Sequence, residues 1–138
     1  MKSGLVRGLT RTRRFEVSED CTIGFMGESM RVYATPFMVR DIERTCRDVI
    51  GEYLTEAENS VGARMEIDHL GPTLKDMWVD VTVSVTALEG RRVSFDAEVR
   101  DALEVVGRAK HVRFVVDLAK QRERLEAKAA KVVQRNRG

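Results

Sequence analysis

The feature that most restricts the fold of this chain is a strict alternation of apolar and polar residues from Trp78 to Leu88. Valines fill one side of this run, and Asp, Thr and Ser fill the other. A period of two is typical of a β-strand with one buried face. Glu89-Gly90 then supplies a turn, and the alternation resumes from Val93 to Val99. The two runs together predict an antiparallel hairpin.

A different period precedes this hairpin. Apolar residues recur at steps of three and four from Met38 to Tyr53, which predicts an amphipathic helix with one buried stripe. Thr35 is a suitable N-cap for it. Pro36 suits the first helical turn, where its missing N–H is no loss. Any free backbone N–H at this helix start would have to come from residue 37 or 38.

Shorter patterns complete the expected fold. Alternating runs predict strands at 63–69 and at about 105–116, and a short first strand is expected at 15–19. Residues 56–60 are expected to form a loop, and a thin apolar stripe over 118–135 predicts a C-terminal helix. One long helix before a run of antiparallel strands indicates an α+β domain, with that helix packed on one face of the sheet. We expect a basic lead-in over 1–14, the folded domain over 15–117, and a helix and tail over 118–138.

Length and composition exclude several classes of protein. The 138 residues suffice for one core without metal or disulfide support. Cys21 and Cys46 have no metal-binding spacing and are expected to be reduced thiols in a cytoplasmic protein. No apolar run of membrane length is present, so no membrane partner is expected. Acids interleave the C-terminal basic residues and no aromatic stacking pattern accompanies them, so we interpret them as solvated and expect no nucleic-acid partner.

Glu43 is the first residue that could carry chemistry. At 100° per residue it falls about 80° from the centre of the helix's apolar stripe, at its border. A carboxylate there either pairs with Arg40 or Arg47 at an ordinary helix edge, or lines a cleft where partial burial tunes its pKa. Both interpretations stay open at this point.

His69 and Thr35 are the other two candidates. His69 shares a strand face with three apolar residues, so its imidazole is expected to point toward the helix. It is either a hydrogen-bonded core residue or a group that moves protons near neutral pH. His111 also alternates with apolar residues and serves as the control for this inference about His69. Thr35 either caps the helix or binds a carbonyl at the helix N-terminus, where negative charge is favoured.

The spacing of Thr35 and Glu43 limits how they can act together. They are eight residues apart, or about 12 Å along one helix. If both lie on the helix of one chain, they cannot contact the same small group. Either Thr35 lies in a loop that folds back toward the site, or a complete site takes groups from two chains.

Four segments between residues 32 and 117 carry a family resemblance. They are Val32-Tyr-Ala-Thr-Pro-Phe-Met38, Ser60-Val-Gly-Ala-Arg-Met-Glu-Ile-Asp-His69, Leu88-Glu-Gly-Arg-Arg-Val-Ser94 and His111-Val-Arg113. These segments resemble hotdog-fold acyl-CoA thioesterases, most closely the fluoroacetyl-CoA thioesterase group. The joint spacing of Thr35, Glu43, Gly62 and His69 is the strongest element.

The resemblance implies a hotdog fold and hydrolysis of a small acyl-CoA thioester to the free acid and CoA. The matching threonine, glutamate and histidine of that group form a catalytic triad, which implies catalytic roles for Thr35, Glu43 and His69. The matching glycine and arginine line its substrate site, which implies substrate-binding roles for Gly62 and Arg113. Coenzyme A is part of the substrate, and no motif for a metal or nucleotide is present, so we expect no cofactor.

Several details stay open under this resemblance. Hotdog enzymes are generally dimers with sites along the interface, so we favour the shared site and expect a homodimer, with tetramers undecided. Glu43 could activate water or attack as a nucleophile. Arg113 could meet the CoA phosphates or be a solvated strand-edge residue. The segment Gly27-Glu-Ser-Met-Arg31 lacks the phenylalanines that gate the acyl pocket in the fluoroacetyl group, so selectivity for fluoroacetyl is doubtful.

The main alternative is a hotdog module that binds acyl-CoA without cleaving it. Such a module would tolerate the loss of Glu43 or His69, and this chain retains both. A hydratase is disfavoured because its usual Asp and His lie several residues apart, whereas Asp68 and His69 are adjacent and face opposite ways.

Overall fold

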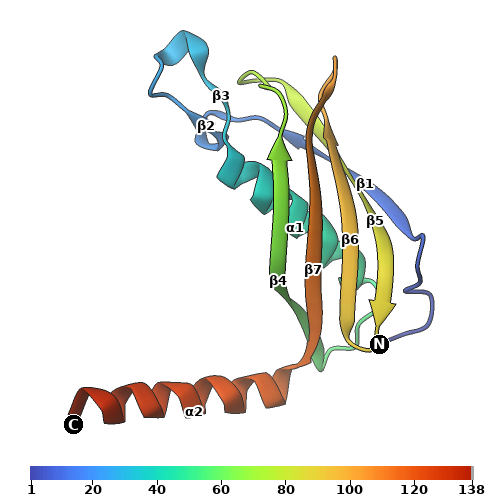
Figure 1. Cartoon of the computed structure of the whole chain (residues 1–138), viewed down its shortest axis with the longest axis vertical. Coiled ribbons are helices and arrows are strands. Elements are labelled where there is room, and N and C mark those ends of the chain that lie inside the picture. The colour runs from blue at the N-terminus through green and yellow to red at the C-terminus, as the bar shows by residue number, and fades with distance from the viewer. Residues whose placement is uncertain (138) are drawn as a thin grey trace.

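A five-stranded antiparallel sheet curves around one long helix in the computed structural model, which describes residues 1–137 (Figure 1). The strand order is β1-β5-β6-β7-β4, and α1 (Thr35–Gly51) crosses one face. A small ribbon of β2 (Thr22–Ile23) and β3 (Val32–Tyr33) leads into α1, and α2 (Leu118–Arg137) follows the last strand. The five strands are β1 (Thr10–Glu16), β4 (Glu58–His69), β5 (Trp78–Glu89), β6 (Arg92–Arg100) and β7 (Val105–Asp117). The predicted α+β fold is confirmed.

The core lies between α1 and the sheet. The predicted hairpin forms, with Val83 opposite Ala97 and Val85 opposite Phe95. The apolar stripe of α1 is buried against it, including Met38 and Ile42, which are both fully buried. Burial of each such side chain stabilises the fold by about 1.5–3 kcal/mol. Packing of one helix stripe on one sheet face therefore supplies the main stabilisation.

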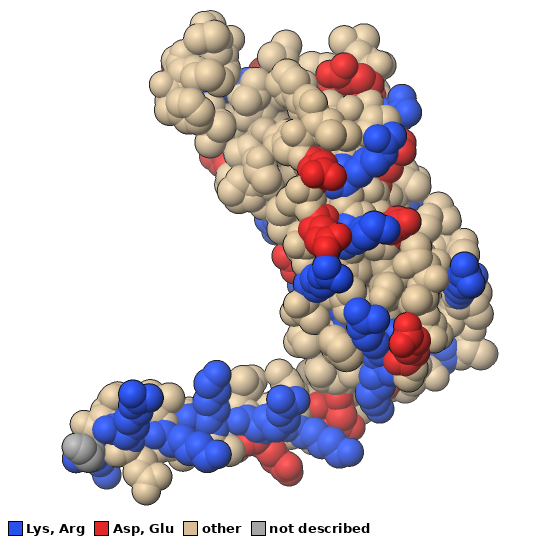
Figure 2. All heavy atoms as spheres, viewed as in Figure 1, with Lys and Arg blue, Asp and Glu red and all other residues tan. Residues whose placement is uncertain are grey.

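The opposite face of the sheet is charged. Cross-strand ion pairs connect Lys110 with Asp96 at 3.4 Å and Arg108 with Glu98 at 3.9 Å. Figure 2 shows these alternating charges along the strands. Exposed pairs of this kind each contribute at most about 1 kcal/mol, so this face is adapted to solvent rather than to a second layer.

Two strand boundaries differ from the sequence-based prediction. The first strand begins at Thr10, inside the predicted lead-in, rather than at Phe15. Its side chains are almost all exposed, so no apolar period marks it. Backbone pairing holds it to β5, from Thr10 opposite Ser84 to Glu16 opposite Trp78. Arg14 adds side-chain contacts, because its guanidinium lies 3.7 Å from the Trp78 ring centroid and pairs with Asp80 at 2.8 Å. At the other boundary, β4 begins at Glu58, within the predicted loop.

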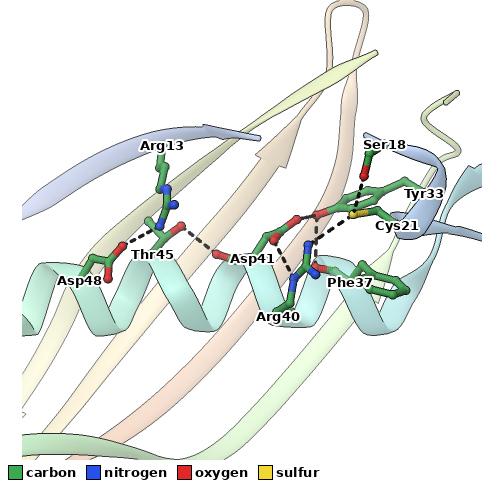
Figure 3. Close-up of polar contacts among 9 residues, drawn as sticks. All are labelled: Arg13, Ser18, Cys21, Tyr33, Phe37, Arg40, Asp41, Thr45 and Asp48. Carbon is green, nitrogen blue, oxygen red and sulfur yellow. Dashed lines mark hydrogen bonds and ion pairs between the residues drawn. The ribbon is translucent and has the colours of Figure 1, made fainter. Parts of the chain in front are cut away.

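The start of α1 is fixed by a buried polar pair and not by the predicted cap. Ala34 occupies the N-cap position, and Thr35 is the first helical residue. The Tyr33 hydroxyl donates to Asp41 Oδ2 at 2.5 Å, and Arg40 Nε donates to Oδ1 of the same carboxylate at 3.2 Å (Figure 3). Burial, and then the nearby carboxylate, raise the pKa of Tyr33 above its ordinary range. The hydroxyl therefore remains a donor at neutral pH.

Replacing Tyr33 by Phe should lower the free energy of unfolding by about 1.5–3 kcal/mol, because a buried carboxylate loses a hydrogen bond. Urea denaturation measures this difference. Tyr53→Phe is the matched control, since the Tyr53 hydroxyl has only a 3.4 Å contact with the exposed Arg11. Equal effects of the two substitutions would contradict a special role for the pair of Tyr33 and Asp41.

Candidate active site

A threonine and a histidine meet where α1 begins and β4 ends. Thr35 Oγ1 lies 2.6 Å from His69 Nδ1. Below them, the Tyr33 ring packs edge-on against the imidazole, with the ring centroids 6.5 Å apart. An unprotonated Nδ1 accepts the hydroxyl hydrogen, whereas a protonated Nδ1 donates to Oγ1 and leaves the hydroxyl hydrogen free for another acceptor. The structure thus brings two of the three predicted catalytic residues into direct contact.

The backbone donors expected at the helix start are already engaged. The N–H groups of Phe37 and Met38 both donate to the carbonyl oxygen of Ala34, at 3.0 and 3.1 Å. Pro36 has no N–H. At this helix start, the Thr35 hydroxyl is therefore the donor best placed for a substrate carbonyl.

Glu43 faces Arg113 two turns further along α1. Glu43 Oε2 lies 3.6 Å from Arg113 Nη1, and the glutamate side chain is 43% exposed. Gly62 lies opposite Arg113 in the pairing of β4 with β7. A Cβ atom on Gly62 would lie 3.0 Å from Glu43 Oε2 and 3.4 Å from Arg113 Nη1. The absence of a side chain at Gly62 therefore lets the glutamate and the arginine approach.

Arg113 is buried, which overturns the alternative of a solvated strand-edge residue. Only 4% of it is exposed. Its Nε and Nη2 donate to the hydroxyl and the carbonyl oxygen of Ser60, both at 2.9 Å. Nη1 lies 3.3 Å from His111 Nε2, while His111 Nδ1 lies 2.7 Å from the Arg64 carbonyl oxygen. These partners make His111 an Nδ1–H tautomer that accepts from Arg113.

Ser60 and His111 contact the candidate site residue Arg113, and the sequence analysis did not single them out for this. His111 served only as a comparison for His69, yet it supports Arg113 from the same strand. The sequence signal that could have found His111 is the period of two along β7, which places residues 109, 111 and 113 on one face, and the structure buries that face. That pattern places an imidazole and a guanidinium side by side on the buried face.

The two groups of residues do not meet within one chain. Among residues 1–137, no hydrogen bond or ion pair connects Thr35 or His69 with Glu43 or Arg113. A groove of about 300 Å³ runs along the intervening surface of α1. Its lining residues are Pro36, Val39, Arg40, Glu43, Arg44, Arg47 and Arg113.

A long helix against a curved antiparallel sheet, with this set of polar residues, defines a hotdog-fold thioesterase. One solved structure of the fluoroacetyl-CoA-specific thioesterase superposes with a TM-score of 0.82 at 28% identity, covering 91% of this chain and 98% of that chain. A thioesterase superfamily member from Thermus thermophilus gives 0.81 at 27% identity, covering 96% of each chain. The predicted hotdog fold is confirmed.

The family follows from sequence. The family described as fluoroacetyl-CoA-specific thioesterase matches residues 17–119. The fluoroacetyl-CoA thioesterase of Streptantibioticus cattleyicolor is 31% identical over 127 residues, which is 87% of this chain and 91% of the relative. The chain therefore belongs to this family and is a thioester hydrolase. The predicted acyl-CoA thioesterase activity is confirmed at the level of the family.

No helix within residues 1–137 is long and apolar enough to cross a membrane.

The two histidines should both titrate below the ordinary histidine pKa of about 6.5. Burial lowers the pKa of His69, opposed by a backbone contact with Gly71. Burial also lowers the pKa of His111, opposed by the Arg64 carbonyl and assisted by Arg113. Both rings should therefore stay neutral as the pH falls through 6.5. NMR titration of the ring protons measures this, with His69→Ala for assignment, and a His69 pKa above 6.5 would contradict it.

Proposed function

We propose that this protein hydrolyses a small acyl-CoA thioester, using Thr35, Glu43 and His69 as catalytic residues. Gly62 and Arg113 support the site from the paired strands β4 and β7. The 2.6 Å contact between Thr35 Oγ1 and His69 Nδ1 carries this proposal. Coenzyme A enters as part of the substrate, and the reaction needs no other cofactor.

In this mechanism His69 Nδ1–H donates to Thr35 Oγ1, so the Thr35 hydroxyl hydrogen is free to bind the thioester carbonyl oxygen. In one route Glu43 orients the attacking water, and His69 takes the water proton at Nε2 and returns it to the departing CoA sulfur. In the other route the Glu43 carboxylate attacks the carbonyl carbon and CoA leaves as the thiolate. Water then cleaves the resulting anhydride, and His69 passes the proton of that water to the thiolate. In both routes the carbon–sulfur bond breaks, and the products are the free acid and CoA.

Arg113 acts as a positioning residue for Glu43 in this proposal. Ser60 and His111, on the paired strands β4 and β7, hold the guanidinium so that Nη1 lies toward the Glu43 carboxylate. Its engagement with Ser60, His111 and Glu43 disfavours the earlier alternative that it meets the CoA phosphates. A buried cation whose donors are all engaged is better suited to orienting a carboxylate than to binding a flexible anionic ligand.

A homodimer would unite the two halves of the site. β4 forms one edge of the sheet, and its twelve residues leave one row of backbone groups unpaired. Unpaired edges of this length invite strand addition. Val61 on this edge is 38% exposed, and Gly62 next to it adjoins Glu43. Pairing of β4 with β4 of a second copy would place Glu43 of one chain near Thr35 and His69 of the other.

Substitution of the catalytic residues should abolish turnover without unfolding the protein. We expect His69→Ala and Glu43→Gln to lower kcat by about 10²–10⁴-fold, the usual contribution of a positioned acid or base. Thiol release from a panel of short, branched and aryl acyl-CoA esters, including fluoroacetyl-CoA, measures this. Asp68→Asn on the same strand and Glu52→Gln at the C-cap of the same helix are matched controls and should keep full activity.

Three outcomes of this panel are informative. Loss in both site variants, with activity in both controls, supports the assigned residues and identifies the acyl class. Turnover that survives His69→Ala would refute the role of His69. Saturable binding of acyl-CoA without turnover of any ester would favour the non-catalytic binding module.

Mixed dimers test whether the site is shared. In a dimer of one Thr35→Val chain and one Glu43→Gln chain, a shared arrangement leaves one site with both residues intact. We expect such a dimer, isolated with two affinity tags, to show about half of the wild-type activity per dimer. Each homodimer of a single variant should be inactive. An inactive mixed dimer would mean that each chain supplies a complete site.

A further inference from the structure

Helix α2 carries five cations along one side, which we call the cationic row. The row consists of Lys120, Arg124, Lys128, Lys131 and Arg135. Their spacing of four, four, three and four residues keeps them within about 80° of the helix circumference, at 100° per residue. Figure 2 shows basic side chains gathered along α2.

The acids of α2 lie on a different side. On the same helical projection, Glu123 and Glu126 fall about 100° and 160° from the centre of the row. The helix therefore separates the row from both acids, although Arg122 and Arg137 lie on the acidic side, about 160° and 140° from the centre of the row. Within residues 1–137 no member of the row forms an ion pair. Like charges four residues apart destabilise a helix, so a bound anion would relieve this repulsion.

The position of α2 relates the row to the sheet edge. The N–H of Leu118 donates to the carbonyl oxygen of Ala57 at 2.9 Å, so α2 begins beside the start of β4. From there it runs outward past the β4 edge (Figure 1). His69 lies at the far end of the same strand. The row of one chain is therefore remote from Thr35 and His69 of that chain.

Dimerisation would change this relation. In an antiparallel pair of β4 strands related by a two-fold axis, the end of one strand lies beside the start of the other. His69 of the second copy then lies near the point where α2 begins. Because α2 runs outward past the β4 edge, the row would extend alongside the second copy, starting near its His69.

The substrate supplies the matching charge. CoA carries a diphosphate and a further phosphate at the end remote from the thioester, and neither Thr35 nor His69 can neutralise them. Arg113 is buried and engaged with Ser60, His111 and Glu43. The row, by contrast, is exposed and unpaired, and several cations in line suit a flexible ligand with several phosphate groups.

We propose that the cationic row of α2 binds the phosphate groups of the CoA whose thioester lies at Thr35 and His69 of the second copy. The proposal rests on the proposed function and on the dimer described above. It assigns acyl recognition and phosphate recognition in one site to different chains.

A triple variant, Arg124→Gln, Lys128→Gln and Lys131→Gln, tests the row. Glutamine has nearly the helix propensity of lysine and arginine, so α2 should remain folded. We expect the Kd for CoA in calorimetry and the KM for acyl-CoA to rise about tenfold, since each exposed ion pair contributes modestly. Both constants should be less sensitive to salt than in the wild type. Turnover of the acyl-pantetheine thioester, which lacks these phosphates, should not change.

A control variant removes the same charge elsewhere. Arg92→Gln, Arg108→Gln and Lys110→Gln lie on the charged face of the sheet and should leave the Kd for CoA unchanged. An unchanged Kd in the row variant would overturn the proposal, as would equal losses with acyl-CoA and acyl-pantetheine. A loss of CoA binding in Arg44→Gln, Arg47→Gln but not in the row variant would assign the phosphates to α1 instead.

Calorimetry also separates this proposal from the proposed function. A wild-type protein that binds CoA but releases no thiol from any ester would refute the hydrolytic function, whereas the comparison of Kd values would still decide the role of the row.

A mixed dimer tests whether the row of one chain serves the site of the other chain. It joins a His69→Ala chain with an intact row to a row-variant chain with intact His69. A low KM supports binding across the interface, and a high KM refutes it.

Discussion

A guanidinium buried in the sheet determines the arrangement of the site. Arg113 is almost inaccessible to solvent, and a charge in that environment is tolerated only when its donors are matched. Ser60 supplies two acceptors, and His111 supplies a third in the one tautomer that its contact with Arg64 allows. These contacts require β4 and β7 to pair in a single register. The same register sets Gly62 opposite Arg113, and this leaves room for Glu43.

The parts of the fold that the sequence predicted are those governed by local periodicity. The hairpin of β5 and β6 and the buried stripe of α1 are visible because each buries one face, and burial imposes an apolar period. β1 was placed too late in the chain because it is an edge strand whose side chains are exposed. Its attachment comes from backbone pairing with β5 and from Arg14 stacking on Trp78, contacts between residues far apart in the sequence. No local pattern encodes such a contact.

The candidate site was likewise only partly predictable from the sequence. The resemblance selected Thr35 and His69, and the structure brings them into contact, but the prediction of Thr35 as the helix cap was wrong. Ala34 occupies that position, and the hydroxyl of Thr35 turns to the imidazole. Whether a threonine hydroxyl caps its own helix or reaches a neighbouring strand depends on where that strand ends. The same limitation hid His111, whose role appears only once Arg113 is known to be buried beside it.

Recognition of an acyl-CoA poses two physically different problems, and the proposed arrangement assigns them to different residues. The acyl unit is small, and one methylene changes its binding by only about 1–3 kcal/mol, so discrimination there depends on the shape of apolar walls. The CoA end is large and anionic, so long-range charge dominates its capture. In the proposed mechanism Thr35 and His69 contact only the carbonyl oxygen and the transferred proton, so they would contribute to neither selection. Catalytic residues can therefore be shared across a family while acyl preference and CoA affinity change independently.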